Sequence, residues 1–576
     1  MRAFKFYLII AISALAFSCS QQETASLTEA EGGKYYGGVF NYNETEYFKS
    51  LYPLNVTEVV GHRLVTQIYE GLVRFDNGDV NTLLPCLAES WEIDSTGTLY
   101  TFKIREGVFF HDDPCFPESK GREVTAYDFE YCLTKTCEAD DMNQGFNFFK
   151  DLILGGEEYY EASKQGVELA EGLSGVRALD EFTLEIELVK PYASFMYRLA
   201  LPFASVFPKE AFDKYGTSKM NTEKCVGTGP FFITQLIPDQ EVILQRNPNY
   251  WGIDADGNQL PYLAGVRIQF IKEDKNVLAE FKKGNLDLKY RLPLELVTEV
   301  LNPDGSLTED YSTYQFQEIN EFTLQYYGFL HKDEVFSNVN VRKAFNYAID
   351  REAIVEFTMK GQGYPAYYGV VPMGFKNYDN EAIEGFSFNP DLARQYMKEA
   401  GYENGAGFPE ITLQLNEGGG RNTNVAEAIK KMLEDNLNIK ISLAKKPFKQ
   451  HLTEIETGYT YFWRLGWVAD YPLPETFLEL FYGKHVPENL HDRSYTNSTR
   501  FEDPAYDVIY EQAISTMDEN LRNELYVKLD QMVTEQAAVL PIFYSKNVRL
   551  LQPNVRNLPQ NPMEYRNLVE VYFVPE

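Results

Sequence analysis

The stretch YTYFWRLGWVADYPLPE, residues 459–475, is a run of aromatic and apolar residues that stops at a single carboxylate, Asp470. Before that carboxylate only Arg464 carries a charge, which is typical of a strand buried at the centre of a sheet. Pro474 is expected to start the next helix. Because ligands of open α/β sheets bind beyond the carboxyl ends of the strands, we expect Asp470 to lie beside a ligand.

The segments before this strand predict an α/β fold. Residues 411–416 alternate between apolar and polar side chains as a strand does, and a second strand is predicted from Ile439. We expect the glycine-rich segment GGGRNTN, residues 418–424, to be a loop. An amphipathic helix should follow it, with the apolar residues Val425, Ala428, Ile429, Met432 and Leu433. Strands joined by a helix in this way pair in parallel through a right-handed crossover.

Two further helices are predicted upstream from apolar residues at helical spacing. The first is expected to end at Gly361 and Gly363, and its buried face consists of Val341, Ala344, Phe345, Ala348 and Ile349. The second is expected to start at the cap Asn389, to end at Gly401, and to bury Leu392, Ala393, Tyr396, Met397 and Ala400.

The N-terminal half has a different pattern. Its short strand-like runs are separated by Gly, Asp and Asn, and they predict an antiparallel or mixed sheet with interspersed helices; examples are residues 99–104, 182–188 and 241–246. The chain of 576 residues is longer than one hydrophobic core usually serves. We therefore expect two or three domains, with the N-terminal half forming a separate lobe.

The N-terminus has the pattern of a secretory leader. Two basic residues precede an apolar run, residues 6–17, that is too short to cross a bilayer. We predict that residues 1–18 are a signal peptide. The sequence LAFSC resembles a bacterial lipobox, so Cys19 is expected to carry a lipid and residues 19–34 to form a flexible tether. The alternative is ordinary cleavage nearby, with Cys19 lost.

Charge and cysteine content limit the partners. The net charge of −32 argues against nucleic acid, and solubility is a sufficient reason for it. The six cysteines include Cys19, and the other five are an odd number, so at least one thiol is free or pairs outside the chain. Their spacing matches no zinc site. We therefore predict neither a metal nor a cofactor.

Several stretches, in this order and spacing, resemble the extracellular solute-binding proteins of family 5, the peptide- and nickel-binding subunits of ABC importers. The resemblance covers nearly all of the chain after the leader. The stretches are IYEGLVRFD (68–76), LAESWEIDSTGTLYTFKIREGVFFHD (87–112), VTAYDFEY (124–131), GTGPFFI (227–233), RNPNYWG (246–252), VRKAFNYAIDREAIV (341–355) and LPIFYSKNVRLLQP (540–553).

The resemblance implies a periplasmic-binding-protein-like α/β fold with mixed sheets, in which two lobes are joined by two hinge crossings. The crossings are expected near residues 316–322 and 541–546. Three domains are implied: domain I from residues 35–75, 208–316 and 541–576, domain II from residues 76–207, and domain III, the opposing lobe, from residues 317–540.

The resemblance also implies roles for individual residues. Asp470 matches the aspartate that receives a peptide's terminal ammonium, a group that every peptide has and that must be paired when it is buried. Arg464 matches a family arginine, and Arg421 falls where peptide binders place a basic residue for the ligand carboxylate. The remaining ligand-binding residues are Gly466, Trp467 and Val468, whose backbone pairs with the ligand, Thr57, Glu58 and Val59 in a strand that pairs from the other lobe, and Tyr544.

The implied protein is not an enzyme but the substrate-binding lipoprotein of an ABC importer. It would be a periplasmic monomer that is held at a membrane by its lipid alone, captures extended oligopeptides between closing lobes and delivers them to an inner-membrane permease. The same fold binds nickel complexes, haem or oligosaccharides in other members, and a secreted glycosidase is a further alternative. Outside a ligand site, Asp470 would be a turn or cap residue, Arg464 would balance a neighbouring acid, and Arg421 would be a solvated loop charge.

Overall fold

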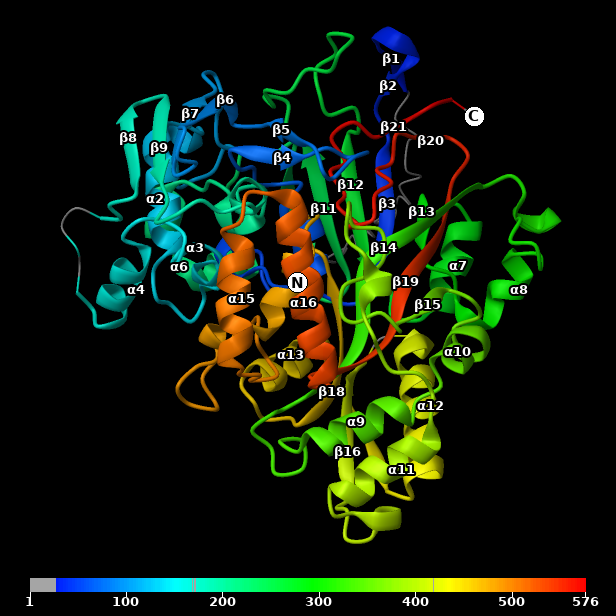
Figure 1. Ribbon diagram of the computed structural model, residues 1–576. Coiled ribbons are helices and arrows are strands. Elements are labelled where there is room, and N and C mark those ends of the chain that lie inside the picture. The colour runs from blue at the N-terminus through cyan, green and yellow to red at the C-terminus, as the bar shows by residue number, and fades with distance from the viewer. Residues whose placement is uncertain (1–26, 168, 170–171, 418, 576) are drawn as a thin grey trace, which may run out of the picture.

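The computed structural model describes residues 27–167, 169, 172–417 and 419–575 (Figure 1). The predicted signal peptide and Cys19 lie outside the described residues. The centre of the molecule is a mixed sheet of 11 strands, and its two longest strands lie side by side in the middle. No helix in the described part of the chain is long and apolar enough to span a membrane.

The two longest strands join two halves of the central sheet. One half contains, in order, β10 (Phe231–Ile237), β11 (Glu241–Arg246), β12 (Gly265–Phe270), β3 (Val39–Glu44) and β13 (Leu288–Tyr290). The joining strands are β19 (Val539–Leu551) and β14 (Gln315–Phe329), with β15 (Gly363–Pro365) paired to β19. The other half contains β18 (Phe462–Val468), β16 (Ile411–Asn416) and β17 (Ile441–Lys446).

The joining strands β14 and β19 run antiparallel and pair in two stretches. Their register shifts between Asn320 and Leu324, where the Phe322 amide instead donates to the Pro562 carbonyl oxygen at 2.7 Å. The segments predicted as hinge crossings, residues 316–322 and 541–546, lie within these two strands. The predicted domain boundaries remain a prediction.

The second half of the sheet has its own apolar core. This core is formed by buried residues of the strands and of helices α9 (Val339–Tyr347), α11 (Pro390–Glu399) and α12 (Gly419–Leu437), which lie together at the bottom of Figure 1. Strands β16 and β17 pair in parallel, and the Asn389 side chain caps α11 by accepting from the Leu392 amide. The predicted strand–helix–strand unit and the capped helix are therefore confirmed.

Two local predictions in this half are wrong. The helix expected to reach Gly361 ends at Tyr347, because Asp350 caps a new helix, α10 (Arg351–Ala353), which continues into a π-helical turn, Ile354–Thr358. The part of the segment GGGRNTN that the structure describes, residues 419–424, is not a loop, since α12 begins at Gly419. Packing of the helix's apolar residues Val425, Ala426, Ile429 and Leu433 overrides the low helix propensity of glycine.

The N-terminal part contains a separate antiparallel sheet of four strands, β6 (Ala88–Ile93), β7 (Leu99–Ile104), β9 (Thr183–Glu187) and β8 (Val176–Asp180). This confirms the strands predicted at residues 99–104 and 182–188. The third predicted strand is β11, which belongs to the central sheet instead. Helices of this part are α2 (Ala126–Thr136), α3 (Phe146–Phe149), α4 (Gly156–Lys164), α5 (Phe195–Arg198) and α6 (Lys209–Thr222).

The remaining helices cover the sheet or connect its strands. They are α1 (Val59–Val65), α7 (Asp274–Lys282), α8 (Val297–Val300), α13 (Phe448–Glu456), α14 (Glu475–Leu478), α15 (Pro504–Ile514) and α16 (Glu519–Glu535). Helix α14 begins directly after Pro474, as predicted. Short strand pairs are formed by β4 (Val73–Phe75) with β5 (Leu83–Pro85), and by β20 (Val555–Arg556) with β21 (Tyr572–Phe573).

Part of the predicted tether is folded. Residues 28–36 form a hairpin from β1 (Thr28–Glu29) and β2 (Tyr35–Tyr36). The Glu31 backbone exchanges hydrogen bonds of 2.9 and 3.1 Å with the Asn258 side chain, and the Lys34 ammonium lies 2.5 Å from a carboxylate oxygen of Asp254. The expectation of a flexible segment up to residue 34 is therefore wrong for its described part, because these contacts fix it to the body.

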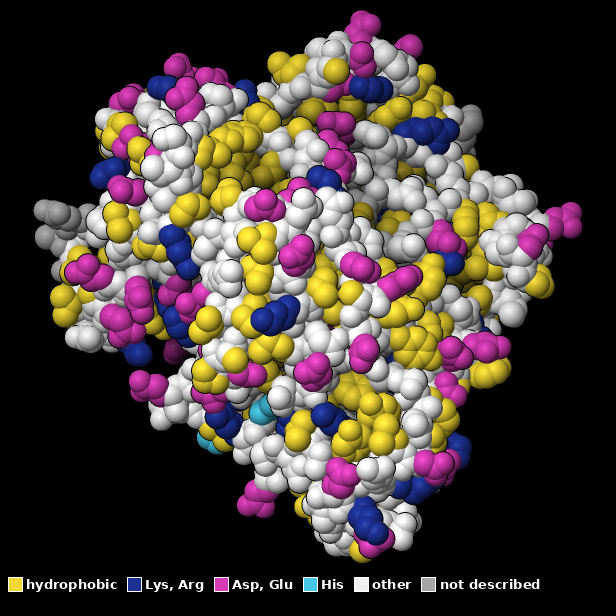
Figure 2. All heavy atoms as spheres, viewed as in Figure 1, with side chains coloured by type: hydrophobic (Ala, Val, Ile, Leu, Met, Phe, Trp, Pro, Cys, Tyr) yellow, Lys and Arg dark blue, Asp and Glu magenta, His cyan; other side chains and the backbone are white. Residues whose placement is uncertain are grey.

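Acidic side chains are spread over the visible face rather than gathered into one patch (Figure 2).

The five cysteines that the structure describes are all free: Cys86, Cys115, Cys132, Cys137 and Cys225.

Candidate ligand-binding site

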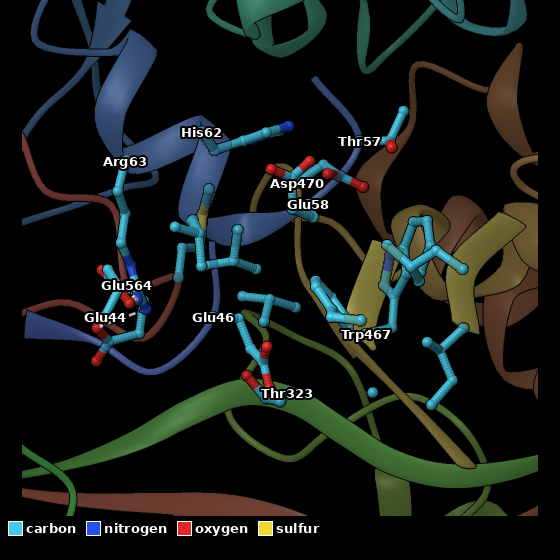
Figure 3. A pocket seen from close by; sticks show the side chains of 18 of the residues that line it. Glu44, Glu46, Thr57, Glu58, His62, Arg63, Thr323, Trp467, Asp470 and Glu564 are labelled. Atoms are coloured by element: carbon cyan, nitrogen blue, oxygen red, sulfur yellow. Dashed lines mark hydrogen bonds and ion pairs between the residues drawn. The ribbon is translucent and has the colours of Figure 1, made fainter. Parts of the chain in front are cut away.

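A cavity of about 340 Å³ lies between the two halves of the central sheet (Figure 3). One wall comes from the segment after β3 and from α1, and the opposite wall comes from β14, β18 and the loop after β18. The cavity is lined by most of the predicted ligand-binding residues, namely Thr57, Glu58, Val59, Arg421, Arg464, Gly466, Trp467, Val468 and Asp470. The structure thus brings these residues together, while their contact with a ligand remains a prediction.

Tyr544 is not among the residues that line this cavity. Its side chain is buried, and its hydroxyl group donates a hydrogen bond to the Gly369 carbonyl oxygen at 2.9 Å. Within β19 it pairs with Leu324 of β14 and with Tyr364 of β15. The structure therefore places Tyr544 away from the cavity, because its buried hydroxyl group is bound to Gly369.

One edge of β18 offers backbone groups to the cavity. The strand pairs with β14 along its whole length, but β16 pairs with its other edge only at Trp463. The Ala469 amide donates to the Phe322 carbonyl oxygen, so the alternation of an antiparallel ladder directs the backbone groups of Gly466 and Val468 away from β14. Among the described residues no partner occupies this stretch of edge, which can therefore accept another extended chain.

The segment Thr57–Val59 on the facing wall is not the strand that was predicted. Glu58 has extended backbone angles, but Val59 already begins α1. The helix starts here because the Glu58 side chain accepts a hydrogen bond from the Gly61 amide at 3.1 Å, as a cap residue does. The Thr57 hydroxyl is buried and has no hydrogen-bond partner in the described part of the protein.

Asp470 follows the end of β18 and is held by the next helix. Its amide donates to the Thr476 hydroxyl oxygen at 3.1 Å, and that hydroxyl donates to the Asp470 carboxylate at 3.1 Å. No cation forms an ion pair with this carboxylate among the described residues. Burial raises the pKa of Asp470 from 3.8 to about 7, and the Thr476 hydrogen bond and the charge of Arg198 oppose the shift only in part.

Two further acids face the cavity without a cationic partner within the described ranges. Glu58 is 6% exposed, and its Oε2 is buried with no hydrogen bond. Glu46 likewise has a buried oxygen, Oε1, without a partner. Burial raises the pKa of each of these carboxyl groups to about 7. Figure 3 shows Glu58 beside Asp470 and Glu46 near Thr323.

Arginines gather elsewhere along the cavity. Arg421, from the first turn of α12, donates to the Gln362 amide oxygen at 2.6 Å, and Arg464 donates to the amide oxygens of Asn416 and Gln325. Neither arginine forms an ion pair with any residue that the structure describes. Burial first, and then in part the charge of Arg291, lowers the pKa of both Arg421 and Arg464 to about 10. The cavity is thus lined by carboxylates and by guanidinium groups that have no ion pair among the described residues.

The sequence model of the bacterial extracellular solute-binding proteins, family 5 (middle region), matches residues 82–488. The chain belongs to this family. It is 26% identical over 536 residues to the periplasmic oligopeptide-binding protein OppA of Escherichia coli, with 91% of each chain covered. It is also 26% identical over 570 residues to heme-binding protein A of Haemophilus influenzae, with 96% of each chain covered.

A solved structure shares the fold of this family 5 protein. The periplasmic binding protein DppA of Helicobacter pylori, in complex with the peptide STSA, superposes with a TM-score of 0.81 at 22% identity, over 93% of this chain and 98% of that one. The two-lobed, mixed α/β fold expected from the sequence is thereby confirmed. The protein is a solute-binding component of the ABC importer type.

Another part of the cavity wall in this solute-binding protein carries buried charges that are paired with one another. On the first wall of the cavity, Arg63 lies 3.1 Å from Glu44 and 3.3 Å from Glu564, and Arg566 lies 2.7 Å from Glu564. The ring of Tyr290 lies against Arg63 and Arg566, with guanidinium-to-centroid distances of 4.9 and 4.4 Å. Because these charges are paired with one another, we do not expect them to form an ion pair with a ligand.

A second paired cluster lies behind Asp470 and connects distant segments. Arg198 at the end of α5 contacts Glu475 at 2.7 Å and Glu479 at 3.0 Å, and it also donates to the Tyr471 hydroxyl oxygen. These contacts tie the N-terminal part to the loop and helix that carry Asp470.

Sequence reasoning missed Glu46, Arg198 and the side-chain role of Glu58. No local pattern pairs Arg198 with acids more than 270 positions away. Glu58 had a detectable signal, since an acid three residues before Gly61 and directly before a helical run is a cap pattern.

Proposed function

We propose that the protein binds an extended oligopeptide between its lobes and delivers it to the permease of an ABC importer. The observation that carries this proposal is the open edge of β18 at Gly466 and Val468, which lies in the cavity between unpaired charges of both signs. A peptide added to this edge would be held by its main chain, and such binding tolerates many side chains.

The unpaired charges suit the two ends of a peptide. Asp470 is a half-buried carboxylate without an ion-pair partner in the described part of the chain, and a terminal ammonium would supply one. Arg421 and Arg464 are half-buried guanidinium groups that donate to neutral amide oxygens, and a terminal carboxylate can bind such a group through two parallel hydrogen bonds. The cost of leaving these charges unpaired in the empty protein is regained when the peptide binds.

Contacts between distant segments support closure around the cargo. Lys49 lies 3.0 Å from Glu456, and Arg493 lies 2.6 Å from Glu456 and donates to the Asn55 side chain at 3.2 Å. These side chains connect the wall that precedes α1 with the end of α13. Closure that makes and breaks such contacts must be reversible, because the permease has to receive the peptide.

The proposal includes the location of the protein. A lipid on Cys19 would hold a monomer at the cell-envelope membrane from which it serves its permease. The protein itself would carry out no covalent chemistry, since its task is capture and release. Labelling with a radioactive lipid precursor tests the anchor: incorporation is expected, and it should be lost in Cys19→Ala.

Native mass spectrometry of the gently purified protein tests the ligand class. Short peptides are the expected adducts, released on mild denaturation. A haem or a metal complex as the adduct would contradict the peptide and favour a non-peptide solute, consistent with the heme-binding relative. Turnover of added glycans would contradict a binding role altogether.

A further inference from the structure

The charged side chains that line the cavity can be sorted by their partners. Among the lining residues, Glu44, Glu564, Arg63 and Arg566 form one ion-paired cluster, Glu456 is paired with Lys49 and Arg493, Asp274 with Lys289, and Arg291 with Glu321. Within the described residues, five lining side chains have no ion pair: Glu46, Glu58, Asp470, Arg421 and Arg464. Acids therefore outnumber bases in the unpaired set.

A zwitterionic peptide does not balance this set. Its ammonium would meet Asp470 and its carboxylate would meet Arg421. Glu46 and Arg464 are close enough for the charge of each to act on the pKa of the other, so these two partly compensate one another. The charge of Lys49, which is paired with Glu456, also acts on Glu58, but without an ion pair. Glu58 is then the acid that neither an ion pair within the described residues nor a peptide terminus completes.

Glu58 has a geometry that favours a ligand contact. Its Oε1 accepts hydrogen bonds from the amides of Lys49 at 2.9 Å and Gly61 at 3.1 Å, which fixes the side chain in one orientation. Its Oε2 is buried and receives no hydrogen bond from the described residues, and Glu58 is one of the residues that line the cavity. A buried oxygen of this kind costs free energy unless a donor reaches it.

The free oxygen lies near the ammonium end of the cavity. Figure 3 shows the Glu58 and Asp470 carboxylates beside each other on facing walls. Both carboxylates also act on one hydroxyl group, since burial first and then the charges of Asp470, Glu456 and Glu58 raise the pKa of Tyr495. A side chain that reaches Glu58 should therefore belong to a residue close to the peptide's amino terminus.

We propose that Glu58 binds the basic side chain of a lysine or arginine at the first or second residue of the peptide. The inference rests on the proposed function and narrows its substrate class to peptides with a cationic amino-terminal segment. A lysine ammonium supplies the hydrogen-bond donor that Oε2 lacks.

Isothermal titration calorimetry with three-residue peptides tests this proposal. The peptides carry one lysine at position one, two or three in an alanine background, and each has a matched peptide with norleucine, which keeps the four-carbon chain and removes the ammonium. At position one or two we expect lysine to bind about tenfold more tightly than norleucine, as one charge-assisted hydrogen bond allows. At position three the two peptides should bind alike.

Two variants locate the preference. In Glu58→Gln the amide oxygen can still accept from the Lys49 and Gly61 amides, so α1 keeps its cap, and the ratio of the norleucine to the lysine dissociation constant should fall to near one. Glu46→Gln removes a charge from the same cavity and should keep the ratio near its original value.

The remaining outcomes overturn the inference in distinguishable ways. Equal binding of lysine and norleucine peptides to the unaltered protein would leave peptide binding intact and refute the basic preference. The assignment to Glu58 would be wrong if the ratio of the norleucine to the lysine dissociation constant stayed unchanged in Glu58→Gln. It would also be wrong if this ratio fell equally in Glu46→Gln. A folded protein that binds none of the peptides would refute the proposed function itself.

Discussion

Two groups of buried charge lie next to each other and differ in one respect. Arg198, Glu475 and Glu479 are paired with one another behind the loop that carries Asp470. Asp470 and Glu58, on the cavity side, have no cationic partner among the described residues. Loss of one member of the first group would leave a buried charge without its partner, whereas the acids of the second group line the cavity and can gain a partner from a ligand. We therefore expect the first group to stabilise the fold and the second group to contact a ligand.

The largest effect is expected from breaking the paired group. Arg198→Met removes the cation between two buried acids and should lower the free energy of unfolding by about 3–5 kcal/mol, the range for a buried pair that loses one partner. Urea denaturation followed by circular dichroism measures it.

Arg177→Met is the matched control for this change. Arg177 also contacts two acids, Glu185 and Glu187 at 3.4 Å each, but its side chain is 50% exposed, so its loss should cost less than about 1 kcal/mol. Equal destabilisation by both variants would contradict the structural role assigned to the Arg198 cluster.

The unpaired acids predict that peptide affinity depends on pH. Burial raises the pKa values of Asp470 and Glu58 to about 7, so below pH 7 each carboxyl group holds a proton that an incoming ammonium must displace. Affinity should therefore fall as the pH decreases from 7 to 5.5, by up to about tenfold per pH unit for each group that must ionise.

Calorimetry in two buffers of different ionisation enthalpy measures this linkage. Proton release on binding is expected below pH 7, and Asp470→Asn should reduce the number of protons released. Proton uptake, or an affinity that does not change over this range, would show that these carboxyl groups do not meet a cation.

A smaller effect is expected at the cationic groups. Arg421→Gln should weaken the binding of a peptide by about 1.5 kcal/mol, roughly one hydrogen bond to a charged group, because Arg464 remains nearby. Amidating the peptide's carboxyl terminus should have little further effect in this variant, whereas it should weaken binding to the unaltered protein. If the losses of binding free energy from Arg421→Gln and from amidation of the peptide were additive, Arg421 would not contact the ligand carboxylate.

The elements that could be predicted from the sequence are those with a clear hydrophobic period or a helix-capping residue. The strand that ends before Asp470, the parallel pair β16–β17 and the helix capped by Asn389 all follow from local patterns. The glycines of residues 418–420 misled the prediction at α12, because helix propensity is weaker than the packing of the apolar face that follows. Asp350 was a cap signal that would have divided the helix after Tyr347.

The site could be located from the sequence, but its charge balance could not. Most residues assigned by resemblance line the cavity, since they lie on a few short segments of the chain. Which charges are paired depends on contacts between distant segments, such as Arg63 with Glu564 and Arg198 with Glu475. Local patterns contain no information on such pairs. The unpaired state of Asp470, Glu58 and Arg421 therefore emerged only from the structure.

The most direct test of the account is a double-mutant cycle between Asp470 and the peptide's terminal ammonium. Calorimetry would compare one peptide with its N-acetylated form, on the unaltered protein and on Asp470→Ala. Acetylation and Asp470→Ala should each weaken binding by about 2–5 kcal/mol, and together by little more than either alone. Fully additive losses, or unchanged affinity in folded Asp470→Ala, would contradict Asp470 as the partner of the peptide's amino terminus.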